Sequence, residues 1–164
     1  MTPALSVIVP AFRGHRSVRA ALDAWDAQTC RERLEIILLC PDAEEATRLL
    51  PACRAIATGS LMLHQARAAG VRAAMADIVI IAEDHCLPEP DCAERLLDRL
   101  AEGWDAVAPS LSPGTAAAAA EASFLLGYGE WMPPVTAGPT AHLPGHNSAL
   151  RRRHLLARED TLDD

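Results

Sequence analysis

The chain has 164 residues, a length typical of one domain that can bury a sizeable core. Half of its residues are hydrophobic and 23% are charged, which is a globular composition and excludes a disordered chain. The formal net charge of −7 at pH 7 argues against broad nucleic-acid binding, because that function needs a basic surface.

The cysteine pattern indicates a reducing environment. The five cysteines form no C-x-x-C pair and are odd in number, so neither a zinc ribbon nor a disulfide framework is expected. A cytoplasmic location follows as the default. No apolar run is long enough for a membrane span, and the first apolar run lacks the basic segment of a signal peptide.

The first half of the chain alternates between predicted strands and helices. Hydrophobic runs at 4–10 and 34–40 predict buried strands, and 55–58 predicts a shorter one. Apolar residues at helical spacing predict an amphipathic helix over 17–28. Asp42 can cap a further helix that Pro51 bends or ends.

The middle of the chain places a helix directly before a buried strand. Residues 67–75 are rich in Ala and Arg, and Gly70 allows this helix to pack closely against a neighbour. Residues 78–82 form a short, continuously apolar and largely β-branched run, typical of a strand that is covered on both faces.

The second half contains fewer long apolar runs. The sequence predicts a helix that starts after Pro88 and ends near Gly103, a short strand over 104–109 and an Ala-rich helix over 116–126. Residues 127–145 are rich in Gly, Pro and aromatic residues, which predicts an irregular loop of the kind that often carries binding residues.

Three ionisable residues, Glu83, Asp84 and His85, follow the apolar run over 78–82. Ligands of open α/β sheets bind beyond the carboxyl ends of the strands. If the backbone stays extended, Glu83 and His85 project to one side and Asp84 to the other, so a carboxylate and an imidazole could share one ion. That pair suits Mn²⁺ or Zn²⁺ better than Mg²⁺. The alternative is a solvated cluster that merely ends a strand.

The stretch 66–88 resembles the family-2 type glycosyltransferases, whose pattern is Ala-Arg-Asn-x-Gly, then Ala-x-Gly-Asp, an apolar strand, Asp-x-Asp and Pro. The residues in register with it are Ala66, Arg67, Gly70, Ala74, Asp77, Glu83, His85 and Pro88. The departures are Ala68 for Asn, Ala76 for Gly, Glu83 for the first Asp of the metal motif and His85 for the second. Related enzymes of this fold contain Asp-x-His, which keeps His85 as a candidate ligand. A register shift of one residue would make Asp84 the ligand.

The resemblance implies an α/β domain with the GT-A nucleotide-sugar-binding fold, a Rossmann-like three-layer arrangement around a mostly parallel sheet. It implies that the nucleotide contacts the loop after the first strand, the end of the second strand, the family's arginine and the metal motif. The matching positions are Pro10, Ala11, Phe12, Cys40, Asp42, Arg67, Glu83 and Asp84. The family usually has Val-Asp-Asp-Gly-Ser where Cys40-Pro41-Asp42 stands, so the contact with the base is lost or passes to Asp42.

The segment from Gly145 to Arg152 resembles the family's Gly-x-Asn-x-x-x-Arg-Arg segment, which opens a helix beside the sugar-phosphate site. The sugar and acceptor candidates in this segment are therefore His146, Asn147, Arg151 and Arg152. Trp131, in the irregular loop over 127–145, is a further candidate. Trp131 could stack on a sugar or cover the core. The arginines could face a diphosphate or lie on a solvated helix face.

The resemblance also implies a catalytic carboxylate, which in the family lies farther beyond the paired arginines than Glu159 and Asp160 do. Those two residues are weak candidates for the base, and the preferred interpretation is a C-terminally truncated chain. Residues 1–164 then form one domain, with a nucleotide-binding part over 1–110 and an incomplete sugar and acceptor part over 111–164.

The implied function is transfer of a sugar from a nucleoside-diphosphate sugar to a glycan, lipid or small molecule, assisted by a divalent metal and with inversion. Mn²⁺ is favoured over Mg²⁺ as the metal. The first alternative is an inactive module that binds a nucleotide sugar but lacks the family's base. A nucleotidyltransferase is a second alternative, although the chain has no Gly-rich phosphate loop after the first strand.

Overall fold

A computed structural model describes residues 2–11, 15–42, 44, 53–115 and 117–158. Within this part of the chain, a six-stranded sheet has the strand order β3-β2-β1-β4-β6-β5. Its strands are β1 (Leu5–Pro10), β2 (Leu34–Cys40), β3 (Arg54–Ala57), β4 (Ile78–Ile81), β5 (Ala106–Val107) and β6 (Ser148–Arg151). The described helices are α1 (His15–Asp26), α3 (Leu63–Ala73), α4 (Cys92–Ala101), α5 (Ala118–Tyr128) and α6 (Arg152–Leu156), with two short 3-10 turns, η1 (Arg31–Arg33) and η2 (Gly129–Trp131).

The sheet is mostly parallel, as predicted. β1 pairs in parallel with β2 and with β4, and β2 pairs in parallel with β3. β6 is antiparallel to both of its neighbours, β4 and β5. The start of β6 therefore lies beside the carboxyl end of β4, where Ile81 pairs with Ser148.

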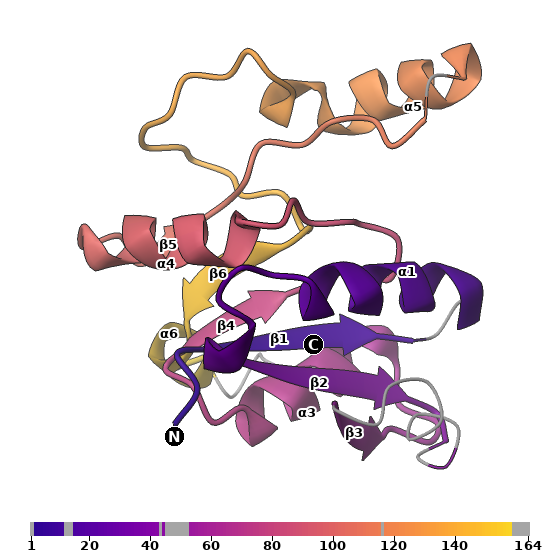
Figure 1. Cartoon of the computed structure of the whole chain (residues 1–164), viewed down its shortest axis with the longest axis vertical. Helices are drawn as coiled ribbons and strands as arrows, with labels where there is room; N and C mark the ends of the chain where they lie inside the picture. The colour runs from indigo at the N-terminus through magenta and orange to yellow at the C-terminus, as the bar shows by residue number, and fades with distance from the viewer. Residues whose placement is uncertain (1, 12–14, 43, 45–52, 116, 159–164) are drawn as a thin grey trace.

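Helices cover the sheet on both faces and give three layers (Figure 1). On one face, α1 and α4 pack with the sheet around a core that includes the fully buried Trp25. On the other face, α3 and α6 pack over a smaller core around Ile8 and Ile37. Because both faces are covered, β1 and β2 are buried along their whole length, which explains why their sequences are apolar except for Ser6 and Glu35.

Gly70 lets α3 approach the sheet closely, as the sequence predicted. A Cβ atom at this position would lie 2.7 Å from Ile8 Cγ2 and 3.2 Å from Leu39 Cδ2. Those distances leave no room for a methyl group unless the sheet or the helix moves. The glycine therefore sets the separation between α3 and β1.

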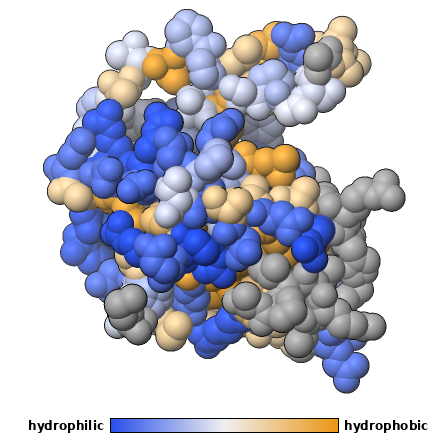
Figure 2. All heavy atoms as spheres, in the orientation of Figure 1, coloured by the Kyte–Doolittle hydropathy of each residue, from blue (hydrophilic) through white to orange (hydrophobic). Residues whose placement is uncertain are grey.

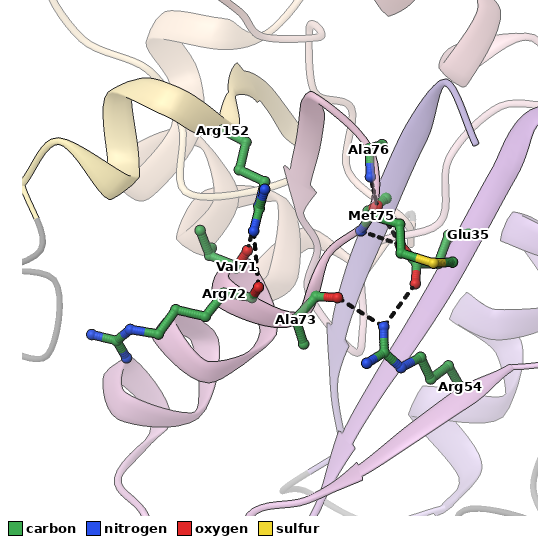
Figure 3. Close-up of polar contacts among 9 residues, drawn as sticks. Glu35, Arg54, Val71, Arg72, Ala73, Met75, Ala76 and Arg152 are labelled. Atoms are coloured by element: carbon green, nitrogen blue, oxygen red, sulfur yellow. Dashed lines mark hydrogen bonds and ion pairs between the residues drawn. The ribbon is translucent and has the colours of Figure 1, made fainter. Parts of the chain in front are cut away.

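A hydrogen-bond network anchors α3 and the start of β4 at the amino end of the sheet (Figure 3). The buried Glu35 carboxylate accepts from the Ser6 hydroxyl at 2.5 Å, from the Met75 N–H at 2.9 Å and from Arg54 at 3.2 Å. Arg54 also donates to the carbonyl of Ala73, at the C-terminus of α3. The carboxylate therefore ties three strands to the helix that precedes β4.

α5 lies apart from the sheet, beyond α4 in Figure 1. None of its described residues is buried, and Leu126 is 91% exposed. Weakly polar and apolar side chains gather over this region in Figure 2. α5 therefore belongs to an arm of the chain between β5 and β6, and its residues contribute nothing to the two cores.

Two sequence expectations need correction here. The segment after Gly145 was expected to open a helix, but it forms β6 and only then the short helix α6. The strand expected over 104–109 is limited to the two residues of β5. β5 is the edge strand on this side of the sheet, and β6 lies between it and β4. Among the described helices, none has the length and apolarity needed to cross a membrane.

Candidate functional site

The carboxyl ends of three parallel strands meet at one edge of the sheet. β1 and β2 are in register up to Pro10 and Leu39, and β1 pairs with β4 up to Ile8 and Ile81. Beyond these pairs, the Ala11 N–H donates to the Leu39 carbonyl at 2.8 Å. The structure therefore brings Pro10, Ala11, Cys40, Asp42 and the segment after β4 to a common rim, as the sequence predicted.

The three ionisable residues after β4 form a compact group. One potential ligand atom from each of Glu83, Asp84 and His85 lies within 4.8 Å of the other two, the one such group of three found among the described residues. The expectation that Asp84 points away from the other two is wrong, because β4 ends at Ile81 and strand alternation does not continue. The chain turns instead, and the Cys86 N–H approaches the Glu83 carbonyl at 3.4 Å.

Asp84 orients the imidazole of His85. Its side chain is 5% exposed, and its Oδ1 lies 3.0 Å from Nδ1 of His85. An ionised carboxylate only accepts hydrogen bonds, so Nδ1 carries the proton in this contact. The lone pair of Nε2 is then free in the neutral ring, and the His85 side chain is 47% exposed.

Arg67 reaches the same group from α3. Its guanidinium forms an ion pair with Oε1 of Glu83, and both side chains are mostly buried. Arg67 is therefore not a freely solvated helix arginine. A permanent positive charge lies directly beside the candidate metal ligands.

Buried polar atoms without a hydrogen-bond partner concentrate at this edge. Among the described residues they are Arg67 Nε, His146 Nδ1, Asn147 Oδ1 and, in the core, Trp25 Nε1. Three of the four flank the Glu83–His85 group, since His146 and Asn147 immediately precede β6. Such atoms are rare in folded proteins because each costs free energy, and they indicate a place for a ligand.

Asn147 adopts a positive φ of 52°, which Asn tolerates better than most residues. Its N–H donates to the Ile81 carbonyl at 3.1 Å, which fixes the start of β6 against the end of β4. His146 lies beside it, with its ring centroid 5.5 Å from that of His85. Burial is the main cause that lowers the pKa of His146; Glu83 opposes it, and His85 and Arg67 act in the same direction as burial. The neutral form of His146 is therefore favoured.

Aromatic side chains at the end of α5 and in η2 contact His146 and one another. The Tyr128 ring centroid lies 4.6 Å from that of His146, and Trp131 follows at 6.3 Å from Tyr128. The Leu111 N–H donates to the Trp131 carbonyl at 2.9 Å and holds this turn. Trp131 was predicted as a candidate sugar contact. The structure connects it to His85 through the rings of Tyr128 and His146.

Arg151 and Arg152 do not lie at this site. β6 runs antiparallel to β4, so its last residue, Arg151, pairs with Ile78 at the amino end of β4. Arg151 donates to the carbonyls of Leu100 and Trp104, and Arg152 to those of Val71 and Arg72. The expectation that they face a diphosphate is corrected on this point, because they close the C-terminal ends of α4 and α3.

Cys40, a predicted nucleotide position, is a buried thiol at the end of β2. It is 2% exposed, and its Sγ lies 3.0 Å from the carbonyl oxygen of Asp42. The Asp42 carboxylate accepts from the Glu44 N–H at 2.8 Å and is itself exposed at the rim. Phe12, Glu159 and Asp160, the other predicted site residues, lie outside the described residues.

Sequence reasoning missed the direction of β6 and the link from Tyr128 to His146. The run from Ser148 to Arg151 is too short for periodicity to identify as a strand. The spacing of Phe124, Tyr128 and Trp131 was a usable signal, because residues four and three apart lie on one face of a helix.

The described residues thus form a three-layer α/β domain with an ionisable group at the carboxyl edge of its sheet, where proteins of this architecture bind ligands. The model of the family "Glycosyl transferase family 2" matches residues 6–156, and the chain belongs to this family. The fold is the GT-A fold of its members.

A solved structure with the same fold is the mannosyltransferase PcManGT from Pyrobaculum calidifontis in complex with GDP-Man and Mn²⁺. It superposes with a TM-score of 0.68 at 21% identity and covers 97% of this chain. The match covers 47% of the mannosyltransferase, so the present chain spans about half of its length. No curated protein matches the sequence.

Proposed function

We propose that this domain transfers a sugar from a nucleoside-diphosphate sugar to an acceptor, with the help of a divalent metal ion and with inversion. The observation that carries the proposal is the Glu83–His85 group beside Arg67 at the carboxyl edge. The family match and the GDP-Man and Mn²⁺ bound to PcManGT support this choice of ligands.

The nucleotide would lie along the ends of β1 and β2. Pro10 ends β1 and Ala11 follows it, and Cys40 ends β2 shortly before Asp42. Phe12 is the next residue of the sequence after Ala11. The resemblance assigns these positions, together with Arg67 and Asp84, to the nucleotide side. The guanidinium of Arg67 suits a diphosphate because it keeps its charge and offers several donors in one plane.

A divalent ion fits the residues present. Glu83 and His85 would hold it, and Asp84 would orient the imidazole through its contact with Nδ1. A mixed oxygen and nitrogen ligand set suits Mn²⁺ better than Mg²⁺. The bound ion would offset the negative charge of the leaving diphosphate.

The residues of this chain would supply the remaining steps. The acceptor hydroxyl attacks the anomeric carbon from the face opposite the diphosphate, a new carbon–oxygen bond forms, and the bond to the diphosphate breaks. The diphosphate leaves with the bonding electron pair, and a carboxylate takes the hydroxyl proton. Glu159 and Asp160 remain the sequence candidates for that base. Residues 1–110 would bind the nucleotide, and 111–164 would serve the sugar and the acceptor.

Calorimetry can test the nucleotide and metal assignment. UDP- and GDP-sugars are titrated into the protein with and without Mn²⁺, and we expect Mn²⁺-dependent binding of at least one of them. His85→Ala should remove the dependence on Mn²⁺. His154→Ala is a matched control, because its side chain is 49% exposed but lies at the opposite end of the sheet on Asp105. Binding that is the same for His85→Ala with and without the metal would contradict the assignment.

Turnover separates the enzyme from the alternative of a binding module that lacks a base. Release of free nucleoside diphosphate from a bound donor, with the sugar recovered on an acceptor, identifies a transferase. Tight Mn²⁺-dependent binding without any product in the full-length protein would instead identify a binding module.

A further inference from the structure

The few aromatic residues of this chain concentrate at one place. The chain has three Trp, two Phe and one Tyr, and three of these six occur between 124 and 131. Phe124 lies 5.6 Å from Tyr128 and Tyr128 lies 6.3 Å from Trp131, with interplanar angles of 40° and 43°. We call Phe124, Tyr128 and Trp131 the aromatic arm.

The aromatic arm does not serve the core. None of the residues of α5 is buried, and the arm belongs to neither of the two core clusters. Its inner end instead meets His146 through Tyr128, and His146 meets His85. The arm therefore continues the site outward from the candidate metal group.

The strand order places the arm on the acceptor side. The proposed nucleotide contacts follow β1 and β2, which lie on one side of β4. His146 precedes β6, which lies on the other side of β4. A donor sugar at the end of β4 would thus have the nucleotide on one side and the aromatic arm on the other.

The stretch of chain that carries the aromatic arm also lacks positively charged side chains. No Lys or Arg occurs between Arg99 and Arg151, whereas Glu102, Asp105, Glu121 and Glu130 do. The nearest described cation of the site, Arg67, is paired with Glu83. A phosphate or carboxylate on the acceptor would therefore find no basic partner on this arm.

We propose that the aromatic arm is the acceptor subsite and that it takes a neutral saccharide. One face of a pyranose ring presents C–H groups, which pack favourably on the electron-rich faces of Tyr128 and Trp131. His146, which meets Tyr128 at the inner end of the arm, carries a buried Nδ1 that has no hydrogen-bond partner among the described residues. This proposal rests on the proposed function and names the acceptor class of the same site.

Saturation-transfer NMR on the full chain can test the acceptor proposal. The probes are maltose, cellobiose and mannobiose, added with UDP or GDP and Mg²⁺, which is diamagnetic. At least one neutral disaccharide should receive saturation, mainly on the C–H groups of one ring face. Trp131→Ala and Tyr128→Ala should each weaken its binding about fivefold.

Matched variants separate stacking from folding. Trp104→Ala removes another Trp, 40% exposed and outside the aromatic arm, and should leave disaccharide binding unchanged. Trp131→Phe keeps a ring and should restore most of the signal. Circular dichroism verifies that each variant is folded.

The experiment distinguishes failure of this proposal from failure of the proposed function. If calorimetry shows nucleotide binding but no neutral disaccharide receives saturation, or if the alanine variants bind it normally, the acceptor proposal is overturned. A response to glucuronic-acid disaccharides or phosphatidylglycerol micelles alone overturns it as well. If no nucleotide binds under any condition, the proposed function itself fails.

Discussion

The two ends of the sheet carry similar residues but use them differently. At the amino end, Glu35 and Arg54 form hydrogen bonds with protein groups, as does Arg152 (Figure 3). At the carboxyl end, Arg67 and Glu83 pair with each other, yet Arg67 Nε and Asn147 Oδ1 lack partners within the described structure. Charged side chains therefore complete the fold at one end and leave polar atoms open to a ligand at the other.

This difference separates structural from functional charges more clearly than residue type does. The paired arginines of the Gly-x-Asn-x-x-x-Arg-Arg segment match the family pattern, but they close the ends of helices. A buried polar group with all its partners in the protein stabilises the fold, whereas a buried group without a partner costs stability unless a ligand binds. Substitutions at the amino end should therefore lower the free energy of unfolding and leave nucleotide affinity unchanged. Substitutions at the carboxyl end should mainly lower nucleotide affinity.

The largest effect on stability is expected for Glu35→Ala. The substitution removes the acceptor of two donors, the Ser6 hydroxyl and the Met75 N–H. It also removes the ion pair between Arg54 and Glu35. Leaving these two donors without their acceptor costs about 1–3 kcal/mol each. Urea unfolding measures the loss, and nucleotide binding below the transition should persist.

Glu32→Ala is the control for Glu35→Ala, because Glu32 is exposed in η1. Its free energy of unfolding should stay within about 0.5 kcal/mol of the wild type. Equal stability losses in the two variants would show that the buried network does not anchor the amino end.

Arg152→Ala should have the next largest effect on stability. Arg152 donates to the carbonyls of Val71 and Arg72 at 2.8 and 2.9 Å, at the C-terminal end of α3. Hydrogen bonds from a charged donor contribute about 1.5–3 kcal/mol, so thermal or urea unfolding should show a loss of that order. The neighbouring Arg153 is 71% exposed, and Arg153→Ala should change little. A loss of nucleotide affinity in Arg152→Ala without a loss of stability would return this residue to the site.

Arg67→Ala should show the reverse profile, with the smallest change in stability. The ion pair with Glu83 is mostly buried, but the substitution also removes the buried Nε of Arg67, which has no partner, so the net cost should be about 1 kcal/mol of unfolding free energy. Nucleotide affinity should fall by about 1–3 kcal/mol, the scale for losing a charged hydrogen bond. Calorimetry with UDP- and GDP-sugars measures the change. Unaltered affinity together with a large stability loss would make Arg67 a structural residue like Arg152.

Local patterns were sufficient where burial is continuous or geometry is tight. The strand at Leu34–Cys40 has the predicted bounds, and Trp25 of the predicted amphipathic helix is buried in the core. Gly70 lies close to its neighbour, the strand β1, as predicted. In each case the information lies in a few neighbouring residues, because a strand covered on both faces needs a run of mostly apolar residues.

The candidate site was predictable only in part. The common rim of Pro10, Cys40 and Glu83 follows from parallel strands that end at the same edge. The turn after Ile81, which brings Asp84 back to His85, could not be predicted, since strand alternation holds only while the backbone stays extended.

The sequence by itself determined the order of the elements, the buried strands and the ionisable group that follows β4, because these depend on hydrophobic pattern and local spacing. Only the tertiary structure decided that β6 runs antiparallel and so separates His146 at the site from Arg151 at the opposite end. It also decided which charged side chains find all their hydrogen-bond partners within the protein. Strand direction and partner choice depend on contacts between residues far apart in the chain, and no local pattern records them.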